Sequence, residues 1–355
     1  MPAQIFYPYA IFIVLLSLGM LALVLRRYEQ ERRPKGYFPK TLVIVPCKGL
    51  DLTLEQNLRS LQKQNYPKYD VVCVVDKKSD ESLKVIRKLG IRSVLSDAKA
   101  QGSGKVRAIA TALQKYGDYG VYVTADSDVC FGNNWLAGLV APLSDKSYGL
   151  STSYPFFNPV GGFWSKVKSA WGLVGEGLLE SNVTRFGWGG SLAFRNGFLG
   201  RKDLERFKKS LSDDIALTTI NQERGLKIFY SNDLGLVVNQ DDGAQQFVEW
   251  ANRQTALSIL GNPSNFYFGV AFYLAQILLL ISPVVMAIFY TPLFLVLLAP
   301  IILGMLRGYF RLKRKFGLYF VISLALPFLY LTNLLLAKGV REITWRGSSY
   351  RLKKV

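Results

Sequence analysis

Apolar residues follow two different patterns along this chain of 355 residues. Near both ends they form long runs without a charged side chain, at residues 5–25, 266–306 and 318–336. The first run suffices to cross about 30 Å of hydrocarbon as a helix. The second is interrupted at Tyr290-Thr291-Pro292, which predicts two spans joined by a tight turn. We therefore expect membrane segments at both ends of the chain.

The region between these runs alternates short β-branched stretches with amphipathic ones. Three stretches predict strands, at 41–45, 71–75 and 121–124, and three predict helices, at 51–64, 81–89 and 105–116; residues 93–95 are weakly strand-like. Strands that alternate with helices predict an α/β fold with a mostly parallel sheet, whose site lies along the carboxyl edge. We divide the chain into an anchor with a basic linker (1–36), a soluble domain (37–260) and a C-terminal membrane region (261–355).

The net charge of +19 is compatible with binding to nucleic acid or to anionic lipids. Basic residues gather beside the apolar runs, at 26–35, 307–315 and 338–354. This placement favours the anionic surface of a membrane over nucleic acid. Because basic residues follow the first run and none precedes it, we expect a retained anchor with the soluble domain in the cytoplasm.

The last apolar run conflicts with this charge pattern. Three full spans after the soluble domain would leave the basic tail outside, whereas its charges favour the cytoplasm. Pro327 lies in the middle of the run, so we prefer a kinked re-entrant hairpin that returns the tail to the cytoplasm. Trp345, Arg346 and Tyr350 would then reach the catalytic edge.

Cysteine and histidine usage narrows the chemistry. The three cysteines, Cys47, Cys73 and Cys130, have no metal-ligand spacing and indicate reduced thiols in a reducing compartment. Histidine is absent. His-ligated zinc is thereby excluded, and a general base must be a carboxylate, a lysine or a tyrosine.

Carboxylates occur where predicted strands end. Asp76 ends the second strand, and Asp126 and Asp128 follow the third. If strand geometry persists, Asp126 and Asp128 share a face, since side chains two apart on a strand point the same way. Such a pair suits Mg²⁺ or Mn²⁺ held jointly with substrate phosphates. The alternative is a solvated acidic turn.

A glycine-rich turn, Gly102-Ser103-Gly104-Lys105, opens the third predicted helix. Amides at a helix N-terminus can face an anion, and Lys105 would add a positive charge. A P-loop is excluded because position 99 is Lys and position 106 is Val. The competing interpretation of Lys105 is an ordinary solvated helix residue.

Residues 161–181 carry apolar side chains at helical spacing, with Lys166 and Lys168 between tryptophans. This predicts either a core helix or one in the lipid headgroup layer that guides a lipid acceptor. The turn Gly187–Ser191 follows, where the lack of side chains would let an acceptor approach the backbone.

Several segments together resemble one family. TLVIVPCKGLD, NYPKYDVVCVVD, DSD, GWGGSLAFRNGFL, LSDDIALT and the tail TWRGSSYRL are similar, in order and spacing, to the membrane-bound inverting glycosyltransferases related to ceramide glucosyltransferase. The resemblance covers residues 41–250 and the tail. It implies the GT-A fold of nucleotide-diphosphosugar transferases.

The resemblance also implies roles for individual residues. Asp76 would contact the base or ribose of the donor, Asp126 the ribose and diphosphate, and Asp128 the metal. Asp214, the second carboxylate of LSDD, would be the general base, with Ser212 or Asp213 capping the helix that begins there. Lys48, at the end of the first strand, and Lys105 would also bind the donor.

The family motif Q/R-x-x-R-W is matched by Gln246 and Trp250, which would contribute to donor binding. Glu249 stands where the family has Arg. A carboxylate cannot neutralise a leaving diphosphate, so we expect Arg253, one helical turn further on, to supply the charge.

These observations predict transfer of a hexose, expected to be glucose from UDP-glucose, to a lipid hydroxyl at the membrane. A processive polysaccharide synthase is the alternative within the same enzyme class. It is disfavoured by the altered motif and the few spans available to line a channel. A nucleotide-sugar-binding membrane protein without catalysis is the alternative from another class.

Overall fold

The computed structural model describes residues 3–26, 31–34, 36–97, 101–312, 317–345 and 347–352. Its contacts divide the chain into two compact units. The first comprises residues 1–29, 161–173 and 242–340, and the second comprises 30–160, 174–241 and 341–355. We call them the membrane unit and the catalytic unit and describe each by itself.

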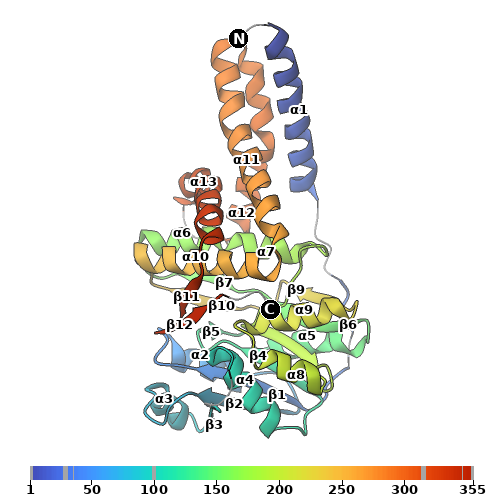
Figure 1. Cartoon of the computed structure of the whole chain (residues 1–355), viewed down its shortest axis with the longest axis vertical. Coiled ribbons are helices and arrows are strands. Elements are labelled where there is room, and N and C mark those ends of the chain that lie inside the picture. Colours follow the sequence, from blue (N-terminus) through green and yellow to red (C-terminus); the bar gives the residue numbers. More distant parts are fainter. Residues whose placement is uncertain are drawn as a thin grey trace. The chain divides into compact units, whose positions relative to one another are not determined.

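A seven-stranded sheet forms the centre of the catalytic unit (Figure 1). Its order is β3 (Arg92–Leu95), β2 (Tyr69–Val75), β1 (Thr41–Cys47), β4 (Val121–Ala125), β8 (Ser191–Arg195), β6 (Tyr148–Ser153) and β9 (Lys227–Ser231). The first four strands are mutually parallel, and β8 runs antiparallel to both of its neighbours. The predicted strands at 41–45, 71–75 and 121–124 are confirmed, and the weak stretch at 93–95 is β3.

The central strand β1 is largely apolar, as is typical of parallel strands that are buried on both faces. Leu42 to Val45 of β1 are fully buried. The helices of this unit are α2 (Leu54–Gln62), α3 (Ser82–Lys88), α4 (Gly104–Lys115), α5 (Trp135–Val140), η1 (Ala141–Ser144), α8 (Arg201–Phe207) and α9 (Asp213–Glu223); α7 (Leu173–Glu180) begins at the unit boundary. The three predicted helices are α2, α3 and α4, with ends shifted by up to three residues.

Two smaller sheets complete the catalytic unit. One pairs β5 (Val129–Cys130), β10 (Val237–Gln240) and β7 (Phe156–Pro159). The other is a hairpin of β11 (Glu342–Trp345) and β12 (Ser348–Arg351), formed by the C-terminal end of the described chain.

The membrane unit contains α1 (Ala3–Leu25), α6 (Phe163–Trp171), α10 (Ala244–Gly261), α11 (Ser264–Phe289), η2 (Pro292–Leu298), α12 (Ala299–Arg311) and α13 (Tyr319–Lys338). Among the described residues, four helical segments are long and apolar enough to cross a membrane: 4–25, 264–289, 292–311 and 319–338. The predicted turn at Tyr290-Thr291-Pro292 separates the second segment from the third.

Two predictions about helices were wrong. Residues 319–338 form one continuous helix that contains Pro327, not a hairpin; a proline is accommodated in such a helix because neighbouring groups satisfy the freed carbonyl. The predicted helix at 161–181 breaks at Gly172, where α6 ends and α7 begins. Most of α6 follows the core interpretation, since Val167 and Trp171 are buried.

Candidate active site

The candidate site is assembled at the carboxyl edge of the parallel strands. Lys48 directly follows β1, Asp76 follows β2 and Asp126 follows β4. These three strands are adjacent and parallel, with β1 in the middle. Their carboxyl ends therefore bring the three side chains to one edge of the sheet, as the sequence predicted.

Strand geometry does not continue through the acidic pair. β4 ends at Ala125, and the chain turns at Ser127 and Asp128. The alternation nevertheless survives in burial: Asp126 and Asp128 are half-buried, whereas Ser127 is 3% exposed and donates a hydrogen bond of 2.6 Å to Asp51. The fixed Ser127 leaves Asp126 and Asp128 as the partly solvent-exposed members of the turn.

A buried lysine links three elements of the site. The Nζ atom of Lys105, in the first turn of α4, lies 2.7 Å from Oδ1 of Asp126 and 3.3 Å from Oδ2 of Asp213. Its side chain is 10% exposed. Burial alone would lower the pKa of Lys105, but the charges of Asp126, Asp213 and Asp214 outweigh it and raise that pKa. Lys105 is therefore a permanent cation, which excludes the solvated-residue interpretation.

Asp213 was missed as a site residue by the sequence analysis. It is 4% exposed, and its Oδ2 atom contacts Lys105 but has no hydrogen-bond partner among the described residues. Burial raises its pKa, against the opposing effect of Lys105. In a pair of aspartates at a helix start, either residue can cap the helix or face a site. The sequence pattern therefore did not identify Asp213 as a partner of Lys105.

The start of α9 differs from the predicted capping. Ser212 occupies the N-cap position, but its side chain makes no capping hydrogen bond. Its hydroxyl instead donates to Oδ1 of Asp214, which also accepts the amide of Ile215 at 2.8 Å. Asp214 is thus held by its own helix N-terminus, while Asp213 turns to Lys105.

The glycine-rich turn before β8 makes room for these carboxylates. A Cβ at Gly189 would lie 2.3 Å from Oδ2 of Asp213, and one at Gly190 would lie 2.7 Å from Oδ2 of Asp126. Real Cβ atoms essentially never approach other heavy atoms this closely. A side chain at residue 189 would therefore displace the Asp213 carboxylate, and one at residue 190 would displace the Trp188 ring and the Asp126 carboxylate.

The motif residues Gln246, Trp250 and Arg253 lie on α10, in the membrane unit. Gln246 closes the start of that helix, where its Oε1 accepts the amide of Gly243 at 2.7 Å. Trp250 packs at 5.0 Å from Trp171, measured between ring centroids, and Nζ of Lys168 lies 4.7 Å from the Trp250 ring. Glu249 accepts a hydrogen bond from Gln245.

Lys168 is a buried cation in the segment for which the sequence predicted either a core helix or one in the headgroup layer. It is 5% exposed and donates hydrogen bonds of 3.1 Å to both carboxylate oxygens of Asp242. Of the two interpretations left open for this segment, the burial of Lys168 favours the core helix over one in the headgroup layer. Trp250 of the motif thus has a cation beside it, Lys168 on α6. In the family motif the cation is the arginine that directly precedes the tryptophan.

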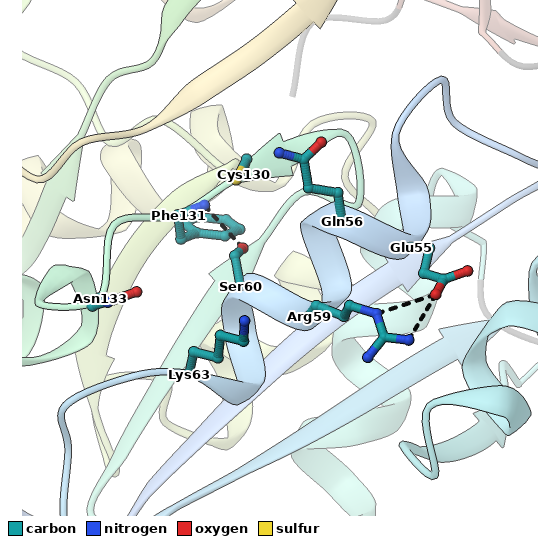
Figure 2. Close-up of a pocket in the computed structure, with 8 residues that line it drawn as sticks. All are labelled: Glu55, Gln56, Arg59, Ser60, Lys63, Cys130, Phe131 and Asn133. Carbon is teal, nitrogen blue, oxygen red and sulfur yellow. Dashed lines mark hydrogen bonds and ion pairs between the residues drawn. The ribbon is translucent and has the colours of Figure 1, made fainter.

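An open hollow on the surface of the catalytic unit is a separate feature (Figure 2). Its lining residues come from α2 and its C-cap and from β5 and the segment after it: Glu55, Gln56, Arg59, Ser60, Lys63, Cys130, Phe131 and Asn133. Arg59 pairs with Glu55, and Phe131 donates its amide to Ser60. None of the candidate site residues lines this hollow.

The carboxylate edge fits a divalent cation that is shared with a substrate. No group of three or more acidic, cysteine or histidine side chains that could by itself hold a metal ion occurs in the parts of the chain that the structure describes. A protein cage for a metal is thus absent from those parts, whereas Mg²⁺ and Mn²⁺ commonly bind through one or two carboxylates plus substrate phosphates. Asp126 and Asp128 provide that oxygen-only donor set.

The fold is of the GT-A type. Among solved structures, a mannosyltransferase from Pyrobaculum calidifontis, in complex with GDP-Man and Mn²⁺, is 17% identical over 92% of this chain and 93% of its own, with a TM-score of 0.52. Glucosyl-3-phosphoglycerate synthase from Mycobacterium tuberculosis is 15% identical over 65% of this chain and 84% of its own, with a TM-score of 0.45.

The profile of glycosyl transferase family 21 matches residues 7–355. The chain therefore belongs to glycosyl transferase family 21, the family of ceramide glucosyltransferase. It is a nucleotide-sugar-dependent hexosyltransferase. The predicted family and enzyme class are confirmed.

Replacing the buried cation tests its role in the site. Lys105→Met should lower the free energy of unfolding by about 3 kcal/mol, because two carboxylates lose their buried partner. The loss is measured by denaturant unfolding, with Lys115→Met, an exposed lysine at the other end of α4, as control. Equal stability of the two variants would show that the cluster does not hold these elements together.

Proposed function

We propose that the protein transfers glucose from UDP-glucose to a lipid hydroxyl, with inversion at the anomeric carbon and with Mg²⁺ or Mn²⁺ as cofactor. The supporting observation is the edge at which the Lys105 cation pairs with Asp126 and Asp213 and interacts with the charge of Asp214, while Asp76 and Asp128 lie at the ends of the neighbouring strands. The finer specificity follows the family resemblance. The apolar helices of the membrane unit support an acceptor that is itself a lipid.

Each residue of the edge has a distinct task in this proposal. Asp128 binds the metal ion, which when bound neutralises the charge that develops on the leaving diphosphate. Asp126 contacts the ribose and diphosphate, and its orientation is fixed by Lys105 at 2.7 Å. Asp76 binds the base or ribose. Lys105 is already paired with two carboxylates. It therefore contributes to donor binding indirectly, by holding Asp126 in place.

Asp214 is the general base of the proposed reaction. Its known contacts, from Ser212 and Ile215, both use Oδ1. We assign Oδ2 to accept the proton of the acceptor hydroxyl. As the oxygen of the acceptor hydroxyl attacks the anomeric carbon, the bond between that carbon and the diphosphate on the opposite face breaks. UDP leaves, and the configuration of the anomeric carbon inverts. Helix α9 holds the base rigidly while the proton transfers.

Gln246, Trp250 and Arg253 are proposed to contribute to donor binding from α10. The family arginine is replaced by Glu249, and two cations belong to the same helical region: Arg253 on α10 and Lys168 beside Trp250. Asp242 balances the charge of Lys168. We therefore retain Arg253 as the residue that supports the leaving diphosphate.

Sugar transfer with matched variants tests this function. The purified protein in detergent should move label from UDP-[¹⁴C]glucose into the organic phase of a lipid extract, only with Mn²⁺ or Mg²⁺. Asp214→Asn should lower kcat by at least about 10²-fold, since general-base catalysis contributes that much. Asp118→Asn, whose carboxylate is 96% exposed, is the control.

The outcome has three informative alternatives. Label in long water-soluble chains would show that the acceptor is a growing polysaccharide and not a lipid. Label from another nucleotide sugar alone would change the donor and keep the reaction. Full activity of Asp214→Asn would remove this residue from the role of base.

We also propose that the C-terminal tail and the catalytic edge lie on the cytoplasmic side of the membrane. The hairpin β11–β12 belongs to the catalytic unit, so both ends of the 242–340 segment meet the same unit. The chain between them must therefore cross the membrane an even number of times. Of the three apolar segments after the catalytic domain, two cross and one does not.

Cysteine accessibility tests this topology. In a Cys130→Ser background, Ser349→Cys in the hairpin and Lys78→Cys in the catalytic unit should both react with a membrane-impermeant maleimide in inverted vesicles. Both positions are exposed. Neither should react in sealed cells. Labelling of the two cysteines from opposite sides would overturn the even count of crossings.

A further inference from the structure

The C-terminal hairpin has one face turned to the catalytic unit. Along β12, Ser348 and Tyr350 are half-buried, while Ser349 and Arg351 are exposed. Tyr350 stands opposite Ile343 in the antiparallel register, and Ile343 is 8% exposed. Residues opposite each other in such a pair share a face of the sheet. Ile343, Ser348 and Tyr350 therefore form the inner face of the hairpin.

This hairpin has a defined, tight geometry. Trp345 pairs with Ser348 across a two-residue connection. Gly347 in this connection has φ of +72°, a conformation that glycine adopts without steric cost. Arg346, which the sequence analysis expected near the catalytic edge, lies outside the described residues.

The inner face contacts the catalytic edge at two points. Nζ of Lys48, which follows β1, donates a hydrogen bond of 3.0 Å to Oγ of Ser348. The amide of Gly104, the first residue of α4, donates one of 3.2 Å to the phenol oxygen of Tyr350. These contacts join residues about 250 to 300 positions apart in sequence. The prediction that Tyr350 reaches this edge is confirmed.

Asp76 lies beside the second contact. A Cβ built on Gly104 would be 3.2 Å from Oδ2 of Asp76 and 3.6 Å from the phenol oxygen of Tyr350. The tyrosine hydroxyl and the Asp76 carboxylate therefore both lie close to the N-terminus of α4. The hairpin thus covers the part of the edge formed by β1, β2 and α4.

The chemistry of this covered corner suits an anion. The N-terminus of α4, a helix of 12 residues, carries positive partial charge and directs amides outward. Lys48 adds an ammonium group. A phenol that accepts one hydrogen bond still has its own proton to donate, and the acceptor role of Tyr350 toward Gly104 directs that proton away from the helix.

We propose that the hairpin 342–351 is a wall of the donor site and that Tyr350 binds the donor, donating its hydroxyl proton to the diphosphate. The amide of Gly104 holds the phenol oxygen in place, and Ser348 positions Lys48 toward the same anion. This inference rests on the proposed function, because it takes the carboxylate edge to be the donor site.

The test compares two substitutions on one strand, in the full-length protein. Tyr350→Phe removes the hydroxyl on the inner face, and Ser349→Ala alters the outer face. Tyr350→Phe should raise the KM for UDP-glucose and the Kd for UDP with Mn²⁺ by about tenfold, the effect of one hydrogen bond to a charged group. The KM for the lipid acceptor and the melting temperature should change little. Ser349→Ala should match the wild type.

A second measurement examines the hairpin directly. Hydrogen exchange at residues 342–351 should slow when UDP and Mn²⁺ are added to the wild type, and the effect should shrink in Tyr350→Phe. A lower melting temperature in Tyr350→Phe with an unchanged Kd for UDP would show a structural strap and overturn the proposal.

The two proposals fail in different ways. If wild type neither binds UDP nor transfers any sugar from UDP donors, the assigned donor is wrong and the inference falls with it. If wild type binds UDP and transfers glucose while Tyr350→Phe binds UDP equally well, the inference alone is wrong.

Discussion

The ion pairs of Lys105 are the interaction on which the catalytic edge depends. This one ammonium group contacts carboxylates from two elements, Asp126 after β4 and Asp213 at the start of α9, while it belongs itself to α4. Two acidic groups so close would repel and take up protons without it. With it, Asp126 is held by an ion pair of 2.7 Å beside Asp128, the residue that we propose to bind the metal.

The same cluster explains why the surrounding sequence is rich in glycine. The turn before β8 passes so close to Asp126 and Asp213 that a methyl group at residue 189 or 190 would overlap their oxygens. Gly104 has Asp76 and Tyr350 as neighbours. These glycines are needed for close packing around charged groups, and so the site tolerates little change in its backbone. The C-terminal hairpin then closes one end of this rigid edge.

Much of the catalytic unit could be predicted from sequence, because its strands are short β-branched runs and their carboxyl ends carry the acidic residues. Residue 128 could be placed near residue 126 by local spacing alone. The role of Asp213 could not, since which carboxylate of a DD pair meets Lys105 depends on how α9 packs against α4. The choice between the two interpretations of the segment around Lys168 could not be made for a similar reason: its partner, Asp242, is 74 residues away. Pro327 was taken as a break, although a helix packed against its neighbours accommodates it.

The central claim is that Asp128 holds a divalent cation together with the donor diphosphate, while Lys105 remains bound to its carboxylates. The most direct measurement is an experimental structure of the wild type with UDP and Mn²⁺, with manganese located by its anomalous scattering. We expect one manganese peak between the Asp128 carboxylate and the diphosphate, and Lys105 still between Asp126 and Asp213. Manganese bound away from Asp128, or UDP bound away from the carboxyl edge of β1, β2 and β4, would contradict this account.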